Sequence, residues 1–363
     1  KILEKYPHLQ EVHGYQLNDF GAIVAAACLS HDIGNPPFGH SGEKAIGEYF
    51  SSGSGQKYKS QVSEKEWQDI VDFEGNANGF SILTSSREGV EGALRLSYAT
   101  LGTFMKYPKE SLPKKPTSNI CDKKYGFFQQ DKKFFQEVAA ELGMISNKTN
   151  PDVGYFRHPL AFLVEAANDI CYTIIDFEDG IKLGLINEDF ALEYLIKLVQ
   201  KSIDSKKYNE LKTKEDRISY LRALAIGSLI NDAVSIFMEN ESDILKGEFS
   251  VSLMDKSQYK AQISDIINIS IKNIYQSKEV IEKEIIGYKV IHTLLDVFTN
   301  AYINTSNNSA TNHDKLVMNI LPEKYKSNKE TMYDKLLNIC QFISLLTDGK
   351  AIEIYKIINA TKI

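Results

Sequence analysis

Apolar residues recur at intervals of three and four along most of this 363-residue chain. The pattern is clearest at 192–199, which is rich in Leu, Ile and Val, and at 263–274, which contains six isoleucines. This spacing gives an α-helix one continuous apolar stripe. The alternating runs typical of strands are scarce, and no Asn-Gly or Asp-Gly turn stands between two such runs. The pattern therefore predicts an all-α fold.

Short stretches rich in Gly, Pro, Ser or Asn interrupt the helical pattern. They fall at 51–55, 108–116, 147–151 and 304–313, and each predicts a loop between helices. None is long or biased enough to be an interdomain linker, and no segment repeats at a fixed period. We therefore expect a single large helical domain over residues 1–363.

Composition and charge exclude several classes of protein. The longest aliphatic run, 23–29, is far shorter than the roughly 20 residues of a membrane-spanning helix. The first residues lack the layout of a secretory signal. The four cysteines are dispersed without a Cys-x-x-Cys pair, which is typical of reduced thiols in the cytoplasm. A net charge of −6 argues against a broad basic surface for duplex nucleic acid. From the short aliphatic run and the dispersed cysteines we expect a cytoplasmic protein that does not cross a membrane.

The first candidate for chemistry is the pair His31–Asp32. Residues 18–34 begin with Asn and Asp, continue with an apolar run and reach Gly34, which predicts a helix whose final turn holds the pair. A divalent cation accepts an imidazole and a carboxylate as ligands, and neighbours at a helix end can converge on one ion. The same dipeptide also suits an ordinary helix C-terminus, where the dipole favours a histidine and the aspartate stays in solvent.

The residues that follow favour the metal-site interpretation. Residues 34–43 read Gly-Asn-Pro-Pro-Phe-Gly-His-Ser-Gly-Glu, a short, stiff turn. It places His40 at the start of a new helix and Glu43 three residues later. There His40 can face the same space as His31 and Asp32, and Glu43 can fix its tautomer or hold its proton. The spacing predicts a catalytic pair.

The longer segment 30–43, which adds Ser-His-Asp-Ile to this turn, resembles the signature of the bacterial deoxyguanosine triphosphate triphosphohydrolases, a branch of the HD-domain metallophosphohydrolases. Further matching segments follow in the family's order: Phe-Glu-Gly-Asn-Ala-Asn-Gly at 73–79, Lys-Tyr-Pro at 106–108, Arg-His-Pro-Leu at 157–160 and Glu-Ala-Ala-Asn-Asp-Ile-Cys-Tyr at 165–172. The resemblance covers a motif core from 18 to about 180, and the helical part 181–363 matches only in patches. It implies the helical HD-domain fold.

The resemblance also implies an activity. The expected reaction is hydrolysis of a deoxynucleoside triphosphate, dGTP by default, to the deoxynucleoside and inorganic triphosphate. The expected cofactor is one divalent metal ion, Mg²⁺ or Mn²⁺, held by a histidine, the His-Asp pair and a later aspartate. Members of the family are usually homo-oligomers, hexamers in the better-known cases, so the resemblance implies an oligomer here.

The family's functional positions carry over residue by residue. His31 and Asp32 match the metal-binding pair. The matches to the other functional positions are His40 and Glu43 for the catalytic histidine and its carboxylate partner, Asn76 and Lys106 for substrate contacts, and Tyr172 and Asp176 for residues around the sugar. A tyrosine packed under the sugar leaves no room for a 2′-hydroxyl, which predicts a preference for deoxynucleotides.

Two positions depart from the family pattern. The family's first metal-binding histidine lies some tens of residues before the pair, and His8 and His13 stand in the wrong context, so we expect its helix to precede Lys1. The late ligand is also altered, because the family has Ala-Asp-Asp-Ile-Cys-Tyr where residues 167–172 read Ala-Asn-Asp-Ile-Cys-Tyr.

The spacing back from Tyr172 assigns the late metal ligand to Asn168. Helix geometry leaves Asp169 open as well, because Asn168, Tyr172 and Asp176 share one face while Asp169 lies near Asp176 at i+7. An amide at Asn168 lacks the negative charge that would help to bind the cation, so we expect weaker metal binding or lower activity.

Two other functions stay open. A broader nucleotide phosphohydrolase of the same superfamily would release monophosphates or orthophosphate. A catalytically impaired regulator that binds nucleotide or nucleic acid is suggested by Asn168 and the missing histidine, although the intact His40–Glu43 pair argues against it. The lysines of 106–124, interleaved with tyrosines, suit either a single-stranded nucleic acid effector or a solvated loop.

Overall fold

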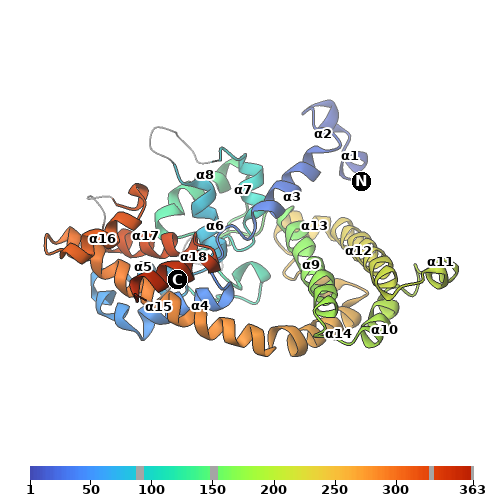
Figure 1. Ribbon diagram of the computed structural model, residues 1–363. Coiled ribbons are helices and arrows are strands. Elements are labelled where there is room, and N and C mark those ends of the chain that lie inside the picture. Colours follow the sequence, from blue (N-terminus) through green and yellow to red (C-terminus); the bar gives the residue numbers. More distant parts are fainter. Residues whose placement is uncertain (87–93, 148–153, 327–330, 361–363) are drawn as a thin grey trace.

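The fold is helical throughout the computed structural model, which describes residues 1–86, 94–147, 154–326 and 331–360. Within these ranges no strand is present, and only two isolated antiparallel bridges occur, Lys109–Gly154 and Ser146–Tyr155. Buried side chains form three apolar cores. Figure 1 shows α9 to α14 gathered at one end of the molecule and α15 to α18 at the other. The predicted all-α fold in a single domain is confirmed, and the four cysteines are free thiols as expected.

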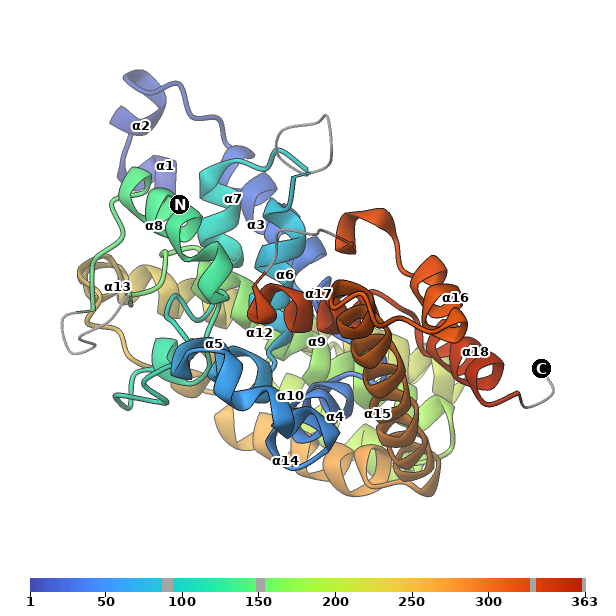
Figure 2. The ribbon, with the colours of Figure 1, turned by 90° about the vertical axis from the view of Figure 1, so that its left-hand side faces the viewer.

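The first group of helices surrounds the long helix α15 (Lys278–Ser306). Its members are α4 (His40–Ser51), η1 (Ser54–Gln61), α5 (Glu64–Val71), α16 (Asn312–Ile320), α17 (Met332–Ser344) and α18 (Asp348–Ile358). Figure 2 shows α4 on one side of α15 and α16 and α18 on the other, and α17 also packs against α15. Phe50 and Phe298 are fully buried in the core between them. This group holds the start of α4, and therefore His40, in place.

The second group is a bundle built on α9 (Ala161–Lys182). Its other members are α10 (Glu188–Val199), α11 (Ser205–Glu210), α12 (Lys214–Glu239), α13 (Glu241–Lys246), η4 (Met254–Lys256), α14 (Lys260–Ser270) and the π-helical turn η5 (Ile271–Tyr275). Of the two periodic segments, 192–199 lies in α10, and 263–274 spans α14 and η5. The apolar face of α10 is buried in the bundle, as the spacing predicts. In the second segment Ile263 and Ile266 are buried, whereas Ile267 and Ile271 are exposed.

The third group links the other two. It contains α3 (Asp19–Ser30), α6 (Gly75–Thr84), α7 (Tyr98–Phe104) and α8 (Lys132–Glu141), with α3 and α7 packed on α9. The remaining helices are short: α1 (Ile2–Lys5), α2 (His8–Glu11), η2 (Ile120–Asp122), η3 (Gln129–Asp131) and η6 (Glu323–Tyr325).

Two sequence predictions need correction. The helix predicted over 18–34 ends at Ser30, because residues 31–34 turn sharply to bring Gly34 against α6, where a Cβ on Gly34 would lie 2.1 Å from the Gly75 carbonyl oxygen. The loop predicted at 304–313 is shorter, since α15 continues to Ser306 and α16 begins at Asn312. The loop predicted at 147–151 lies, beyond Asn147, outside the described residues.

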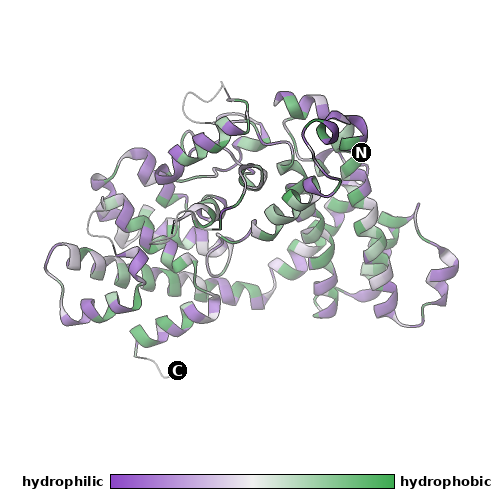
Figure 3. Ribbon diagram, turned by 90° about the horizontal axis from the view of Figure 1, so that it is seen from above, coloured by the Kyte–Doolittle hydropathy of each residue, from purple (hydrophilic) through white to green (hydrophobic). Residues whose placement is uncertain are grey.

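Helix α12 is the one described helix that is long and apolar enough to cross a bilayer by length and composition alone. The core helix of a soluble protein passes the same test. In this structure α12 packs along α9 and α10, and its Leu221, Ala225 and Leu229 are fully buried. Hydrophilic and hydrophobic residues lie side by side along the helices of this fold (Figure 3).

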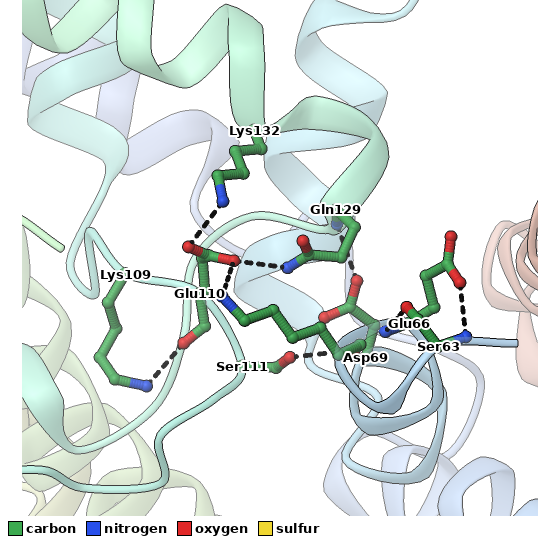
Figure 4. Close-up of polar contacts among 9 residues, drawn as sticks. Ser63, Glu66, Asp69, Lys109, Glu110, Ser111, Gln129 and Lys132 are labelled. Carbon is green, nitrogen blue, oxygen red and sulfur yellow. Dashed lines mark hydrogen bonds and ion pairs between the residues drawn. The ribbon is translucent and has the colours of Figure 1, made fainter. Parts of the chain in front are cut away.

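Asp69 of α5 is a fully buried carboxyl group. Figure 4 shows it beside Gln129 and Glu110. Its Oδ2 accepts hydrogen bonds from the Tyr333 hydroxyl at 2.5 Å and from the Gln129 backbone N–H at 2.7 Å. Its Oδ1 has no hydrogen-bond partner among the described residues. Burial raises the pKa of Asp69 from 3.8 to about 7, so the folded protein favours the neutral acid.

Asp69→Asn is expected to stabilise the protein at pH 8 but not at pH 4. The pKa of Asp69 is higher in the folded than in the unfolded protein. The contribution of its neutral carboxyl group to the free energy of unfolding is therefore complete below pH 4 and is lost as the pH rises through about 7. Asparagine does not ionise and avoids this loss, so the gain at pH 8 is on the order of 2–4 kcal/mol. Urea unfolding at both pH values tests it, with exposed Asp265→Asn as the control. A gain of equal size at pH 4 would contradict the titration.

Candidate active site

A cavity of about 380 Å³ lies where the three groups of helices meet. Eight of the nine predicted site residues line it: His31, Asp32, His40, Glu43, Asn76, Lys106, Asn168 and Tyr172. They come from the turn after α3, from α4, from α6, from the segment after α7 and from α9. The ninth, Asp176, is not among the lining residues. The structure therefore brings together side chains separated by up to 141 positions in the sequence.

The turn between α3 and α4 fixes the relative positions of the two histidines. Phe38 and Gly39 have positive φ angles of 65° and 58°, a conformation that reverses the chain directly before His40. The turn is held by a hydrogen bond of 2.9 Å from the Phe38 N–H to Asp348. The Asn78 amide donates to the Gly34 carbonyl at 2.8 Å. The strained turn is thus anchored to α6 and α18.

His31 and Asp32 form a close pair at one wall of the cavity. The Nδ1 of His31 lies 2.7 Å from the Cys28 carbonyl, and because a carbonyl only accepts, Nδ1 carries the proton. The Nε2 of His31 lies 3.0 Å from Asp32 Oδ2. Each partner favours the other's charge, so the pKa of His31 is raised and that of Asp32 is lowered. A positive charge, either a proton or a cation, is therefore stabilised at His31 Nε2.

This pair is the part of the site that fits a divalent cation. His31 Nε2 is buried and makes no hydrogen bond of good geometry, so it is the ring atom available as a ligand. Asn168 lines the same cavity and offers an amide oxygen, which hard cations accept. Within the described ranges, no three His, Cys, Asp or Glu side chains converge as a metal-ligand cluster. The donors on the page are thus one imidazole, one carboxylate and one amide.

His40 and Glu43 line the cavity from the first turn of α4. Desolvation lowers the pKa of His40, with Lys124 adding to the effect, so the imidazole is neutral at pH 7. Glu43 accepts a hydrogen bond of 2.7 Å from the Gly75 N–H at the start of α6. Burial and the nearby Glu74 carboxylate raise the pKa of Glu43 to about 7. The sequence predicted a contact between Glu43 and His40. In the structure Glu43 is instead hydrogen-bonded to the N-terminus of α6.

Lys106 presents its ammonium group to the cavity from a well-fixed backbone. The Nε of Arg157 donates to the Lys106 carbonyl at 2.6 Å, and the guanidinium forms a two-point ion pair with Glu165 at 2.5 and 2.9 Å. Burial lowers the pKa of Lys106. Arg157 is 5% exposed, so this pair is structural and holds the lysine in position.

A second cationic group on the cavity wall escaped the sequence interpretation. Lys124 forms an ion pair with Glu74 at 2.8 Å, and the Asn76 amide donates to the same carboxylate at 2.6 Å. Glu74 stood inside a matching motif and Lys124 inside the lysine-rich stretch, but nothing in the spacing indicated that they meet. Ser252 and Asp255, also unpredicted, line the cavity from the loop before η4 and from η4.

Helix α9 carries Asn168, Tyr172 and Asp176 on one face. Tyr172 is 45% exposed, and partial burial raises its pKa, with Asp32 adding to the effect. Asn168 and Tyr172 line the same cavity as His31 and Asp32, so this face of α9 looks toward the pair. Asp176 accepts a short hydrogen bond from the Tyr275 hydroxyl in η5. Asp169 also lines the cavity, and burial raises its pKa to about 7, with Glu165 adding to the effect.

Three further histidines lie outside the cavity lining. The Nδ1 of His158 accepts a hydrogen bond from the Leu160 N–H at 3.3 Å just before α9 begins. The Nε2 of His292, which is partly buried, lies 2.9 Å from the Ala45 carbonyl oxygen. His313 is exposed. It lies in the first turn of α16 and not in a loop.

Comparison with known proteins identifies relatives over most of the chain. A deoxyguanosinetriphosphate triphosphohydrolase-like protein of Synechocystis sp. is 36% identical over 95% of this chain and 79% of its own length. A protein of the same name from Pseudomonas aeruginosa is 33% identical over 93% of this chain and 76% of its own. A deoxyguanosinetriphosphate triphosphohydrolase of Yersinia pseudotuberculosis is 28% identical over 82% and 66%. No protein-family model matches. With two such relatives above 30% identity along nearly the whole sequence, the chain belongs to the deoxyguanosinetriphosphate triphosphohydrolase family.

Proposed function

We propose that this protein hydrolyses deoxynucleoside triphosphates, with dGTP as the first substrate to test, to the deoxynucleoside and inorganic triphosphate. In the balanced reaction, water forms a new bond to the α-phosphorus, the bond from that phosphorus to the 5′ oxygen breaks, and the 5′ oxygen gains a proton. The observation that carries the proposal is the convergence of eight predicted residues on one cavity of about 380 Å³.

The proposed cofactor is Mg²⁺ or Mn²⁺. His31, Asp32 and Asn168 would hold it. When bound, such an ion neutralises phosphate charge and lowers the pKa of a coordinated water to about 7 in favourable sites. The chain's own contribution is to orient these donors. The Cys28 carbonyl fixes the tautomer of His31 so that Nε2 is free to bind.

His40 is the proposed proton-transfer group. Its lowered pKa keeps the imidazole neutral at pH 7, so it can accept a proton from water. Once protonated, the imidazole can donate that proton to the 5′ oxygen. Glu43 supports α4 from beside it through the Gly75 N–H. Lys106 and Lys124 supply positive charge to the triphosphate, and the Asn76 amide lines the same cavity.

The direct test is incubation of the protein with each dNTP in Mg²⁺ or Mn²⁺, with products separated by chromatography. The proposal requires deoxynucleoside and triphosphate in equal amounts. Monophosphate or orthophosphate would instead identify the broader phosphohydrolase. Tight dNTP binding without turnover would identify the impaired regulator. The observation in favour of that alternative is Asn168, whose amide lacks the negative charge of an aspartate ligand. Light scattering of the same sample tests the proposed homo-oligomer.

Tyr172→Ala is expected to admit ribonucleotides. The exposed tyrosine lines the cavity and lies on the same face of α9 as Asp176, where its ring would pack under the sugar and exclude a 2′-hydroxyl. We expect the ratio of kcat/KM for dGTP over GTP to fall by about tenfold to a hundredfold. Exposed Phe190→Ala in α10 is the matched control. Strict retention of the deoxy preference in Tyr172→Ala would refute this role.

A further inference from the structure

A second hollow adjoins the candidate active site. It measures about 430 Å³, within the range of roughly 300–1,000 Å³ that small-molecule sites occupy. We name it the lysine cavity after the five lysines that line it: Lys109, Lys114, Lys115, Lys123 and Lys124. Three carboxylates, those of Asp72, Glu74 and Asp122, line it as well. In a chain of net charge −6, five ammonium groups around one hollow are a local excess of positive charge.

The three carboxylates are already occupied. Asp72 pairs with Lys114 at 2.5 Å, and Glu74 pairs with Lys124 at 2.8 Å. Asp122 is 1% exposed and accepts hydrogen bonds from the side chains of Thr117 and Asn147. No carboxylate of the described residues forms an ion pair with Lys115 or Lys123, both of which are exposed.

Lys109 is the most unusual member of the lysine cavity, because it is only 2% exposed. Its ammonium group donates to the Glu110 backbone carbonyl at 2.6 Å. The neighbouring Glu110 carboxylate turns the other way, toward Lys132 at 2.9 Å and Gln129 at 3.0 Å (Figure 4). Lys65 binds it as well, at 3.1 Å. The Glu110 carboxylate is therefore bound elsewhere. The hydrogen-bond partner of the buried Lys109 ammonium group is a neutral oxygen, and its strongest electrostatic neighbour, Asp122, forms no ion pair with it. Such a charge is costly unless an anion accompanies it.

The lysine cavity and the candidate active site share three lining residues, Glu74, Lys123 and Lys124. The two cavities are therefore contiguous, and ammonium groups line both sides of the boundary between them. Condensed phosphate suits the lysine cavity. It carries several negative charges and has only acceptor oxygens, which ammonium donors bind.

We propose that the lysine cavity binds inorganic triphosphate and holds it as it leaves the candidate active site. The binding site is read from the lysines themselves, whereas the identity of triphosphate as a product rests on the proposed function. The shared chemistry is condensed phosphate, and free inorganic triphosphate and the phosphate chain of a second nucleotide are its two sources.

Calorimetric titration of the full chain with sodium triphosphate in EDTA tests the site without metal and without turnover. Lys115→Asn removes one unpaired ammonium group. Asparagine tolerates the positive φ of 42° at this position, so the variant keeps the backbone. We expect triphosphate to bind about threefold to tenfold more weakly. Lys109→Met should weaken it further. The control is Lys212→Asn, an exposed loop lysine remote in sequence from the cavity, which should bind as the unaltered protein does.

The outcomes separate the site from the reaction. If Lys115→Asn and Lys109→Met bind triphosphate as tightly as the Lys212→Asn control, or if Lys106→Met alone abolishes binding, the anion sits in the candidate active site and the inference is overturned. Lys115-dependent binding of dGTP with none of triphosphate would assign the cavity to a second nucleotide and also overturn it. Lys115-dependent triphosphate binding in a protein that hydrolyses no dNTP would retain the site and refute the proposed function.

Discussion

His40→Ala is expected to lower kcat for dNTP hydrolysis by about 10² to 10⁴, the range over which a positioned acid or base contributes. His40 lines the cavity in the first turn of α4, and its lowered pKa keeps a neutral imidazole available at pH 7. The side chain is exposed and its removal leaves the core intact, so melting temperature and metal content should not change. Steady-state kinetics with dGTP and Mn²⁺ give the measurement.

The matched control for this variant is His313→Ala. His313 is also exposed and also lies in the first turn of a helix, but it is not among the residues that line the cavity. It should retain full activity. If His40→Ala keeps more than about a tenth of the activity, proton transfer does not depend on this imidazole and the catalytic role is wrong.

The fold class and the local geometry of the site were predictable because short-range sequence determines them. Periods of three and four mark helices wherever they occur. The Pro-Pro-Phe-Gly segment limits the backbone so strongly that His40 must start a new helix close to His31. The end of α3 was misplaced by four residues, because Gly34 is needed for its contact with Gly75 in α6 and not as a helix stop.

The rest depends on contacts between distant segments, and a single sequence does not encode those distances locally. Lys124 meets Glu74 across 50 positions, and Arg157 meets the Lys106 carbonyl across 51. The predicted sugar contact Asp176 is bound to Tyr275, which lies 99 positions away in a π-helical turn. In each case both residues are ordinary polar side chains until packing brings them together.

The composition of the lysine stretch illustrates the same limit. As a sequence, residues 106–124 suit either an effector site or, more readily, a solvated loop. The structure divides these lysines according to their partners. Lys114 and Lys124 are paired with acids, Lys109 is buried on a carbonyl, and Lys115 forms no ion pair with a carboxylate of the described residues. The lysines available to an anion are therefore identified by the structure and not by the sequence.

Asn168→Asp is the second large effect we expect, and it has the opposite sign. The described donors for a cation are His31 Nε2, the Asp32 carboxylate and the Asn168 amide, so a second carboxylate doubles the anionic charge among them. Because the number of charged ligands sets the affinity for a hard cation, Mn²⁺ should bind about tenfold to a hundredfold more tightly. Hydrolysis at limiting Mn²⁺ should rise in parallel. Metal titration and dGTP kinetics on the same sample measure both.

Asp169→Asn is the companion variant that decides which residue faces the metal. Asp169 has Glu165 and Lys106 as its strongest electrostatic neighbours, whereas the Asn168–Tyr172 face of α9 senses Asp32. Asp169→Asn should therefore leave Mn²⁺ affinity nearly unchanged. If it instead weakens Mn²⁺ binding while Asn168→Asp changes neither affinity nor turnover, the ligand is Asp169. The chain would then have kept the charge of its metal site one position further along α9.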